Sequence, residues 1–388
     1  MANTKSHKTR AQYKSIVCTF QGGGALGAYQ AGVLRALDEA GYYPDWYVGT
    51  SIGAINAAIA AGNPEKIRVE KIMQFWDSIA TPECIVDIDS LFSDDPFSRK
   101  AHHLLSSHAA LWLGQPGFFT PRVTPPFLSC HNRPDNISYY DTAPLRDNLE
   151  RFIDFDRINN NKIVRLSVGA VEISSGQMTY FDSFKQKIGP EHIMASGALP
   201  PGFPAIEING KFYWDGGISS NTPINYVLNH QDNKNLLCFM VHLFDSYGLN
   251  PTTLDEIIKR KKDIEFSSRF AKMVELYKQI QELKNSIHVL AQHVPKEKKS
   301  DPKIKLCISR GHESTISIVR FLYTHDETEL SSKDYEFSRK SIHERAAHGY
   351  QDGIHAMKQS PWLKHIPITE GIKLYDMSKS KKLKEVLK

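Results

Sequence analysis

The sequence predicts an α/β fold with a mostly parallel central sheet, and three features of the chain support this class. The run at 15–20 is typical of a buried strand, and it leads through glycines 22–24 into an Ala-rich helix. A second strand at 46–48 is followed by a glycine turn and a helix over 54–61. Two such units in succession are typical of parallel βαβ architecture, in which ligands bind at the carboxyl ends of the strands. The third feature is the run at 235–244, which is apolar apart from Asn235 and His242 and is typical of a buried strand.

The middle of the chain changes character. Residues 84–145 are rich in proline and aromatic side chains and show little periodicity, so we expect a cap or an irregular insertion there. Strand patterns return at 163–168 and 178–181. The dipeptide Asn209-Gly210 lies between two short β-prone runs and predicts a type I′ hairpin.

After Pro251 the pattern becomes mainly helical. Apolar residues recur at steps of three and four from 270 to 290, which predicts a long amphipathic helix. A strand over 315–323 and a helix over 335–357 follow. We therefore expect one α/β domain over residues 15–245 and a mainly helical C-terminal domain over residues 251–388.

The composition is that of an ordinary soluble globular protein, with 41% hydrophobic and 23% charged residues. No stretch approaches the roughly 18–20 apolar residues that span a bilayer, and no apolar run follows the basic N-terminus, so we expect a cytoplasmic protein. Five scattered cysteines without a C-x-x-C pair predict a reducing compartment and no zinc site. The chain offers no sign of a metal or an organic cofactor.

Ser51 is the first candidate catalytic residue. It lies in the segment Gly49-Thr50-Ser51-Ile52-Gly53, between a strand and a helix. A serine in so tight a strand-to-helix turn presents its hydroxyl, and the following helix directs free N–H groups toward the same place. This pattern favours a nucleophile.

The glycines Gly22, Gly23 and Gly24 form the second candidate element. Residues 22–27 match the glycine part of a dinucleotide-binding loop, but no acidic residue ends the second strand, which ends instead beside Ser51. The alternative is an oxyanion hole, in which glycines allow backbone N–H groups to converge on a developing alkoxide. The pairing with Ser51 favours the oxyanion hole.

Asp215 is the third element. It ends a predicted strand after the Asn209-Gly210 hairpin, and two glycines follow it. An aspartate there is compatible with ordinary turn chemistry, yet it can also serve as the general base for a serine hydroxyl. For that role it needs a partly apolar surrounding that raises its basicity, which Trp214 and residues 195–203 can supply.

Together the three motifs resemble the patatin-like phospholipase family. The motifs GGGALG, GTSIG and DGG occur in that order, and the segment around Asp215 is similar to the family's signature; the likeness covers residues 15 to about 245. It implies a three-layer α/β/α fold and a Ser51–Asp215 dyad without metal or cofactor. It also implies an oxyanion hole at Gly22–Gly24, helped by the N–H of Ile52. Residues after Pro251 are similar to a C-terminal region carried by some bacterial members.

The resemblance implies hydrolysis of fatty-acyl esters of phospholipids or lysophospholipids through an acyl-enzyme. Two alternatives stay open. A Ser–Asp–His triad needs a histidine after Asp215, and His242 at the end of a buried strand is the best placed. The other alternative is a non-catalytic lipid-binding protein with the same fold.

The expected partners follow from the same observations. A lipid acyl ester is the substrate, and nothing in the sequence supports nucleic-acid binding. The net charge of +5 is concentrated in residues 251–388, which predicts either peripheral contact with anionic membranes or a solvated helix face. The amphipathic stretch over 254–292 is a candidate homo-oligomer contact, and the aromatic residues between Trp112 and Phe127 are candidates for lipid contact.

Overall fold

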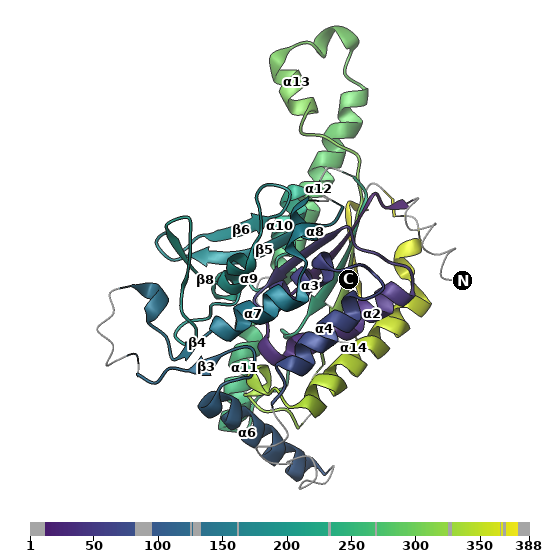
Figure 1. Cartoon of the computed structure of the whole chain (residues 1–388). Coiled ribbons are helices and arrows are strands. Elements are labelled where there is room, and N and C mark those ends of the chain that lie inside the picture. Colours follow the sequence, from purple (N-terminus) through teal and green to yellow (C-terminus); the bar gives the residue numbers. More distant parts are fainter. Residues whose placement is uncertain are drawn as a thin grey trace.

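The computed structural model of the chain shows helices on both faces of one large sheet (Figure 1). It describes residues 12–81, 95–124, 126, 133–160, 163–231, 234–267, 270–324, 328–364, 366–367 and 370–378. The predicted lipid-contact residue Phe127 and the basic tail over 379–388 lie outside these ranges.

The described residues form a nine-stranded sheet in the order β11-β10-β9-β1-β2-β5-β8-β7, with β6 paired to β5. All pairs from β11 to β5 on this path are parallel, and the pairs that involve β6, β7 and β8 are antiparallel. The mostly parallel sheet predicted from the sequence is confirmed. The strands are β1 (Ser15–Phe20), β2 (Trp46–Thr50), β5 (Arg165–Glu172), β6 (Met178–Asp182), β7 (Ile206–Ile208), β8 (Lys211–Asp215), β9 (Leu236–His242), β10 (Ile316–Leu322) and β11 (Ile372–Asp376).

The helices form the outer layers. Alternate residues of β1 belong to two separate apolar cores: Ile16, Cys18 and Phe20 pack in one and Val17 in the other, as the two-residue period of a strand requires. The first core contains side chains of α2 (Ala28–Glu39), α3 (Ile52–Gly62), α4 (Arg68–Ser78), α7 (Ala143–Phe152), α8 (Phe155–Asn160), α9 (Pro190–Ser196) and α14 (Arg339–Gln359). The second contains side chains of α10 (Ile224–His230) and α12 (Phe270–Gln292).

The hairpin at Asn209-Gly210 forms as predicted. It joins β7 to β8, and both turn residues have positive φ, 52° and 76°, as a type I′ turn requires. It matters for function because β8 ends on Asp215, so the hairpin sets where that carboxylate lies.

The C-terminal part is mainly helical, as expected, but it also completes the central sheet. Strand β10 pairs in parallel with β9, and β11 pairs in parallel with β10; the sequence analysis did not predict β11. Helix α14 packs against α2 so closely that a Cβ on Gly32 would lie 1.8 Å from the carbonyl oxygen of Ala346. Residues 251–388 therefore share the sheet and the core with the N-terminal part, which the predicted division into two domains did not include.

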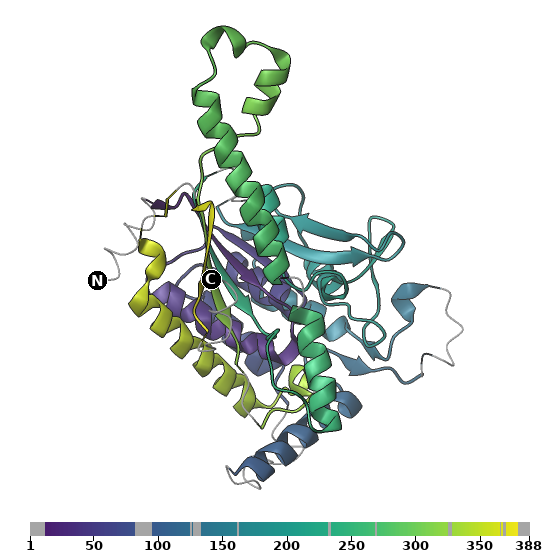
Figure 2. The same ribbon diagram turned by 180° about the vertical axis from the view of Figure 1, so that it is seen from behind.

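Three further helices and a small sheet lie outside these layers (Figures 1 and 2). The region predicted as a cap or insertion contains α6 (Pro96–Leu113) and the short antiparallel pair β3 (Thr120–Pro121) and β4 (Tyr140–Asp141). Helix α11 (Leu254–Ser267) lies beside α6, whereas α13 (Pro302–Ile308) and the end of α12 project from the opposite side of the molecule. The helix predicted over 254–292 is thus α11 and α12, and its role in oligomerisation stays a prediction. Within the described residues, no helix is both long and apolar enough to cross a bilayer.

Candidate active site

A cavity of about 300 Å³ opens at the carboxyl ends of the parallel strands and brings all the predicted site residues together. Gly22, Gly23, Gly24, Ser51, Ile52 and Asp215 all line it. Most of the remaining wall is apolar and comes from α6, the 118–119 and 199–203 segments, α11 and the segment after β10. These apolar wall residues include Leu111, Phe118, Phe119, Leu199, Phe203, Phe244, Phe266 and Phe337.

Ser51 occupies the sharp turn between β2 and α3. Its backbone angles are φ 57° and ψ −129°, a conformation that non-glycine residues rarely adopt and that costs on the order of 1–3 kcal/mol. The surrounding structure supports this strain. The N–H of Ser51 donates to the carbonyl oxygen (3.1 Å) and the hydroxyl (3.0 Å) of Ser196, and that hydroxyl donates to the carbonyl of Gly169 at 2.6 Å.

Asp215 is the hydrogen-bond partner of the Ser51 hydroxyl. It is only 3% exposed, and burial raises the pKa of its carboxyl to about 6, against the opposing effect of hydrogen bonds from Ser51 and from the N–H of Gly217. The Gly217 bond is 2.6 Å long. A carboxylate with a raised pKa is a stronger base, so at neutral pH this aspartate is ionised and able to accept the serine proton.

The glycine loop lies directly beside Ser51. A Cβ on Gly22 would lie 2.9 Å from Cβ of Ser51 and 2.4 Å from the side-chain oxygen of Asn221, so a larger residue does not fit there. Gly24 has a φ of 54°, and a Cβ there would collide with the carbonyl of Asp334. These positions require glycine for the backbone to approach the serine.

Four backbone N–H groups at this loop and at the start of α3 have no hydrogen-bond acceptor in the part of the chain that the structure describes. Among the described residues, none accepts a hydrogen bond from the N–H of Gly22, Gly23, Gly24 or Ile52. Because Ile52 is the first residue of α3, its N–H also carries the positive end of that helix dipole. Free donors beside a nucleophile are the arrangement that stabilises an oxyanion.

Two residues that hold the glycine loop were missed by the sequence analysis. Gln21 is buried; its side-chain oxygen accepts from the N–H groups of Leu243 (2.6 Å) and Phe244 (3.3 Å), and its amide nitrogen donates to Thr222 and to the carbonyl of Phe266. Asn221 donates to the carbonyl of Gly22 at 3.0 Å.

Ser196 is the third missed residue, through its contacts with the Ser51 turn. The sequence contains only weak signals for these three residues. Gln21 is a polar residue directly after an apolar strand, and Ser196 and Asn221 are small polar residues on either side of the Asp215 motif. Their partners are distant in the sequence, so no local pattern could assign their roles.

His242 is not placed to complete a catalytic triad. It ends β9, outside the cavity wall, and its Nδ1 accepts from Nε of Arg320 at 3.2 Å while its ring packs on Phe270. Burial, and then the charge of Arg320, lowers the pKa of this imidazole well below its usual value. Its environment is that of a neutral core histidine bound to a structural arginine.

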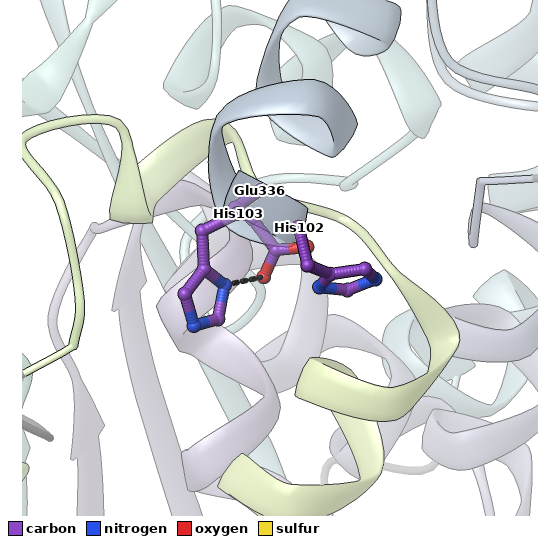
Figure 3. A group of neighbouring side chains, drawn as sticks. All are labelled: His102, His103 and Glu336. Atoms are coloured by element: carbon purple, nitrogen blue, oxygen red, sulfur yellow. Dashed lines mark ion pairs between the residues drawn. The ribbon is translucent and has the colours of Figure 1, made fainter. Parts of the chain in front are cut away.

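Outside the cavity, two histidines and a glutamate lie close enough together to resemble a metal site. His102, His103 and Glu336 each place one potential ligand atom within 4.8 Å of the others, and Figure 3 shows the His103 ring pointing at the carboxylate. Nδ1 of His103 lies 3.6 Å from Oε2 of Glu336, and Nη2 of Arg345 lies 3.4 Å from the same oxygen. The guanidinium already matches the carboxylate charge, so the geometry favours an ion-paired anchor over a cation site.

Comparison with known families identifies related sequences for both parts of the chain. A family described as "Patatin-like phospholipase" matches residues 19–228, and one described as "Patatin phospholipase" matches residues 264–368. The human and mouse proteins named patatin-like phospholipase domain-containing protein 6 are each 33% identical over 107 residues. That match covers 26% of this chain and 8% of theirs, so it concerns a small part of those proteins.

Solved structures show more distant likeness. VipD from Legionella pneumophila is 13% identical with a TM-score of 0.38, and the match covers 89% of this chain and 67% of VipD. ExoU of Pseudomonas aeruginosa, in complex with SpcU, is 15% identical with a TM-score of 0.31, over 76% of this chain and 61% of that chain.

Proposed function

We propose that this chain, which belongs to the patatin-like phospholipase family, is a serine acyl hydrolase that cleaves fatty-acyl esters of phospholipids or lysophospholipids. The observation that carries the proposal is the hydrogen bond between the strained Ser51 and a buried Asp215 whose pKa is raised to about 6. Both residues face an apolar cavity beside free backbone N–H groups.

The reaction begins when Oγ of Ser51 attacks the acyl carbonyl carbon and Asp215 accepts the hydroxyl proton. The N–H groups of Gly22–Gly24 and Ile52 stabilise the oxyanion of the tetrahedral intermediate. When that intermediate collapses, the ester C–O bond breaks and Asp215 returns the proton to the leaving alcohol. Water then attacks the acyl-enzyme with Asp215 as base, and a fatty acid and free Ser51 result.

The apolar cavity wall supports an acyl chain as the group that enters. Phe118, Phe119 and Phe203 form an aromatic cluster with ring centroids 5.1–5.9 Å apart, and Tyr140 contacts two of these rings. A cavity with such walls and few polar groups gains free energy by taking hydrocarbon out of water.

The test is hydrolysis of mixed phospholipids and lysophospholipids by the purified chain, with products identified by mass spectrometry. We expect fatty acid and the matching deacylated lipid from the natural sequence and none above background from Ser51→Ala. Equal product from both proteins would reject Ser51 as nucleophile. Lipid binding without turnover in either would favour the non-catalytic alternative.

A further inference from the structure

Helices α6 and α11 turn their polar sides toward the protein and their apolar sides toward solvent. In an ordinary surface helix the apolar stripe faces the core. In α6 the buried positions include His102, His103, Ser106 and Ser107, whereas the exposed positions include Phe97, Leu104, Leu105, Trp112 and Leu113. Phe97 is 81% and Trp112 79% exposed.

Helix α11 has the same reversed polarity. Leu254, Ile257, Ile258 and Ile264 are exposed, and their spacings of three, four and seven residues place them on one helix face. Some of its charged residues face inward, although Glu256, Lys261 and Glu265 are exposed. Asp263 accepts from the buried Lys333 at 2.6 Å, and Lys262 pairs with Asp334 at 2.6 Å.

Both helices are fixed to the same segment, residues 329–337. Lys259 donates to the carbonyl of Glu329, and Lys262 donates to that of Ser331, whereas His103 of α6 faces Glu336 (Figure 3). This segment also forms part of the cavity wall through Asp334, Tyr335 and Phe337. The polar contacts thus hold the two helices in place with their apolar sides outward.

The two apolar faces lie next to each other at the cavity. Figures 1 and 2 both place α6 beside α11, and hydrogen bonds from Thr252 together with the charge of Lys100 on α6 lower the pKa of Glu256 on α11. Each helix also contributes a cavity-wall residue near its C-terminal end, Leu111 from α6 and Phe266 from α11. The apolar surface therefore borders the cavity.

We propose that the outward faces of α6 and α11 form a docking surface for a lipid bilayer, from which an acyl chain enters the cavity. This inference rests on the proposed function for the source of the substrate. Helix α6 carries no acidic side chain, and its exposed side includes Lys100 and His108, which suits a surface of phosphate headgroups. The exposed indole of Trp112, at the cavity end of α6, is the side chain that favours a membrane–water boundary.

The experiment measures binding to vesicles of phosphatidylcholine with a minority of phosphatidylglycerol, by co-sedimentation. The chain carries Ser51→Ala throughout, so lipid turnover does not affect the result. Leu104→Glu on α6 and Ile257→Glu on α11 are the test variants. Leu290→Glu, a 65% exposed position near the end of α12, is the matched control on the projecting part of the molecule.

We expect each test variant to weaken vesicle binding about tenfold or more, since each replaces an exposed apolar side chain that the bilayer would bury with a charged one. The control should stay within about twofold, as for a surface change away from the contact. Tryptophan fluorescence should shift to the blue with vesicles, because Trp112 is 79% exposed, whereas Trp46, Trp76 and Trp362 are buried and Trp214 is partly buried. Equal weakening by the control, or no vesicle binding at all, overturns the inference.

Two further measurements distinguish failure of the docking surface from failure of the proposed hydrolase function. With Ser51 restored, turnover of a soluble short-chain ester by the Leu104→Glu and Ile257→Glu variants should match the natural sequence, since neither residue lines the cavity. Loss of vesicle binding with retained ester turnover supports the docking surface. No ester turnover by the natural sequence would reject the proposed function and leave the vesicle result standing. A dimer dissolved by Leu104→Glu, without vesicle binding, would assign the surface to a second copy and overturn the inference.

Discussion

Two buried carboxylates, Asp215 in the cavity and Glu336 beneath α6, have opposite proton affinities. Asp215 is 3% exposed and Glu336 is fully buried, so loss of water penalises the charge on both. At Asp215 the effect of burial is larger than that of the hydrogen bonds from Ser51 and Gly217, and it raises the pKa to about 6. At Glu336 the neighbouring His103 and the charge of Arg345 overcome burial and hold the pKa well below the usual range.

The difference lies in the partners. The groups that favour the charged form of Asp215 are a hydroxyl and a backbone N–H, which stabilise a carboxylate weakly. Glu336 accepts from the N–H of Ser338 and faces a guanidinium and an imidazole. A buried carboxylate without a positively charged neighbour thus has a raised pKa and can act as a base. A buried carboxylate beside such a neighbour stays ionised and acts as a structural anchor.

The largest expected effect is the loss of activity in Asp215→Asn. Asparagine cannot accept the proton of Ser51, so we expect kcat on a soluble ester to fall by at least about 10³-fold. The same change should stabilise the fold, because it removes a buried charge. Ester turnover and urea unfolding, measured on the same sample, test the expected loss of kcat and the expected gain in stability. A variant that keeps a tenth of the activity would contradict the role of Asp215 as base.

Glu336→Gln should destabilise the fold, in contrast to Asp215→Asn. Removing this charge leaves Glu329 as the remaining buried carboxylate that pairs with Arg345, so we expect a loss of about 1–3 kcal/mol. The matched control is Glu344→Gln on α14, the helix that carries Arg345; the partly exposed pair of Glu344 with Arg99 is worth about 1 kcal/mol or less. Urea unfolding of both variants decides. A loss at Glu336 no larger than that at Glu344 would show that the anchor contributes little.

The contributions of Asp215 and Glu336 to the free energy of unfolding should change in opposite directions as pH rises. The unfolded chain releases the Asp215 proton near pH 3.8, whereas the folded chain releases it near 6, so this group lowers stability as pH rises between these values. Two pKa units correspond to about 3 kcal/mol. Glu336 has a lowered pKa, so its contribution is present above its unfolded pKa and is lost as pH falls.

The measurement is the free energy of unfolding of the natural sequence and of Asp215→Asn across pH 4–7. We expect their difference to open as pH rises and to level above 6. On the natural sequence, kcat/KM should rise through an apparent pKa near 6, since the dyad needs ionised Asp215. A flat difference in stability, or activity that is constant down to pH 5, would contradict the assigned shift.

The smallest expected effect concerns the positioning of Ser51. Ser196→Ala removes one of two acceptors for the Ser51 N–H and the bond to Gly169, so we expect kcat/KM to fall about tenfold. Ser51 keeps the carbonyl of Ser196 as acceptor, which limits the loss. Ser174→Ala, at a solvent-exposed position, is the control. Equal activity in both variants would show that the carbonyl alone holds the turn.

Much of the fold and the candidate site was predictable because its signals are local. The two strand–turn–helix units, the Asn209-Gly210 hairpin and the positions of Ser51 and Asp215 each depend on neighbours within a few residues. The conformation of Ser51 follows the same rule, since its small flanking residues permit the turn. Strand β11 was missed because its short sequence, IKLYD, has a pattern that many loops share.

The roles of Gln21, Asn221 and Ser196 could not be predicted in this way. Each bonds to a group far away along the chain, as Asn221 does to Gly22. The reversed polarity of α6 was equally hidden, because residues 84–145 show little periodicity from which a covered side could be predicted. That side depends on Glu336 and Arg345, which lie more than 200 residues later.

By itself, the sequence determined the α/β class, the order of the three motifs and the identity of the serine and aspartate that the family resemblance pairs. Only the tertiary structure decided that His242 is bound to Arg320 and that β10 and β11 complete the central sheet. It also decided that Asp215 lacks the countercharge that Glu336 has. The physical reason is that backbone conformation responds to adjacent residues. Proton affinity and burial respond to everything within a few ångströms, whatever its distance along the chain.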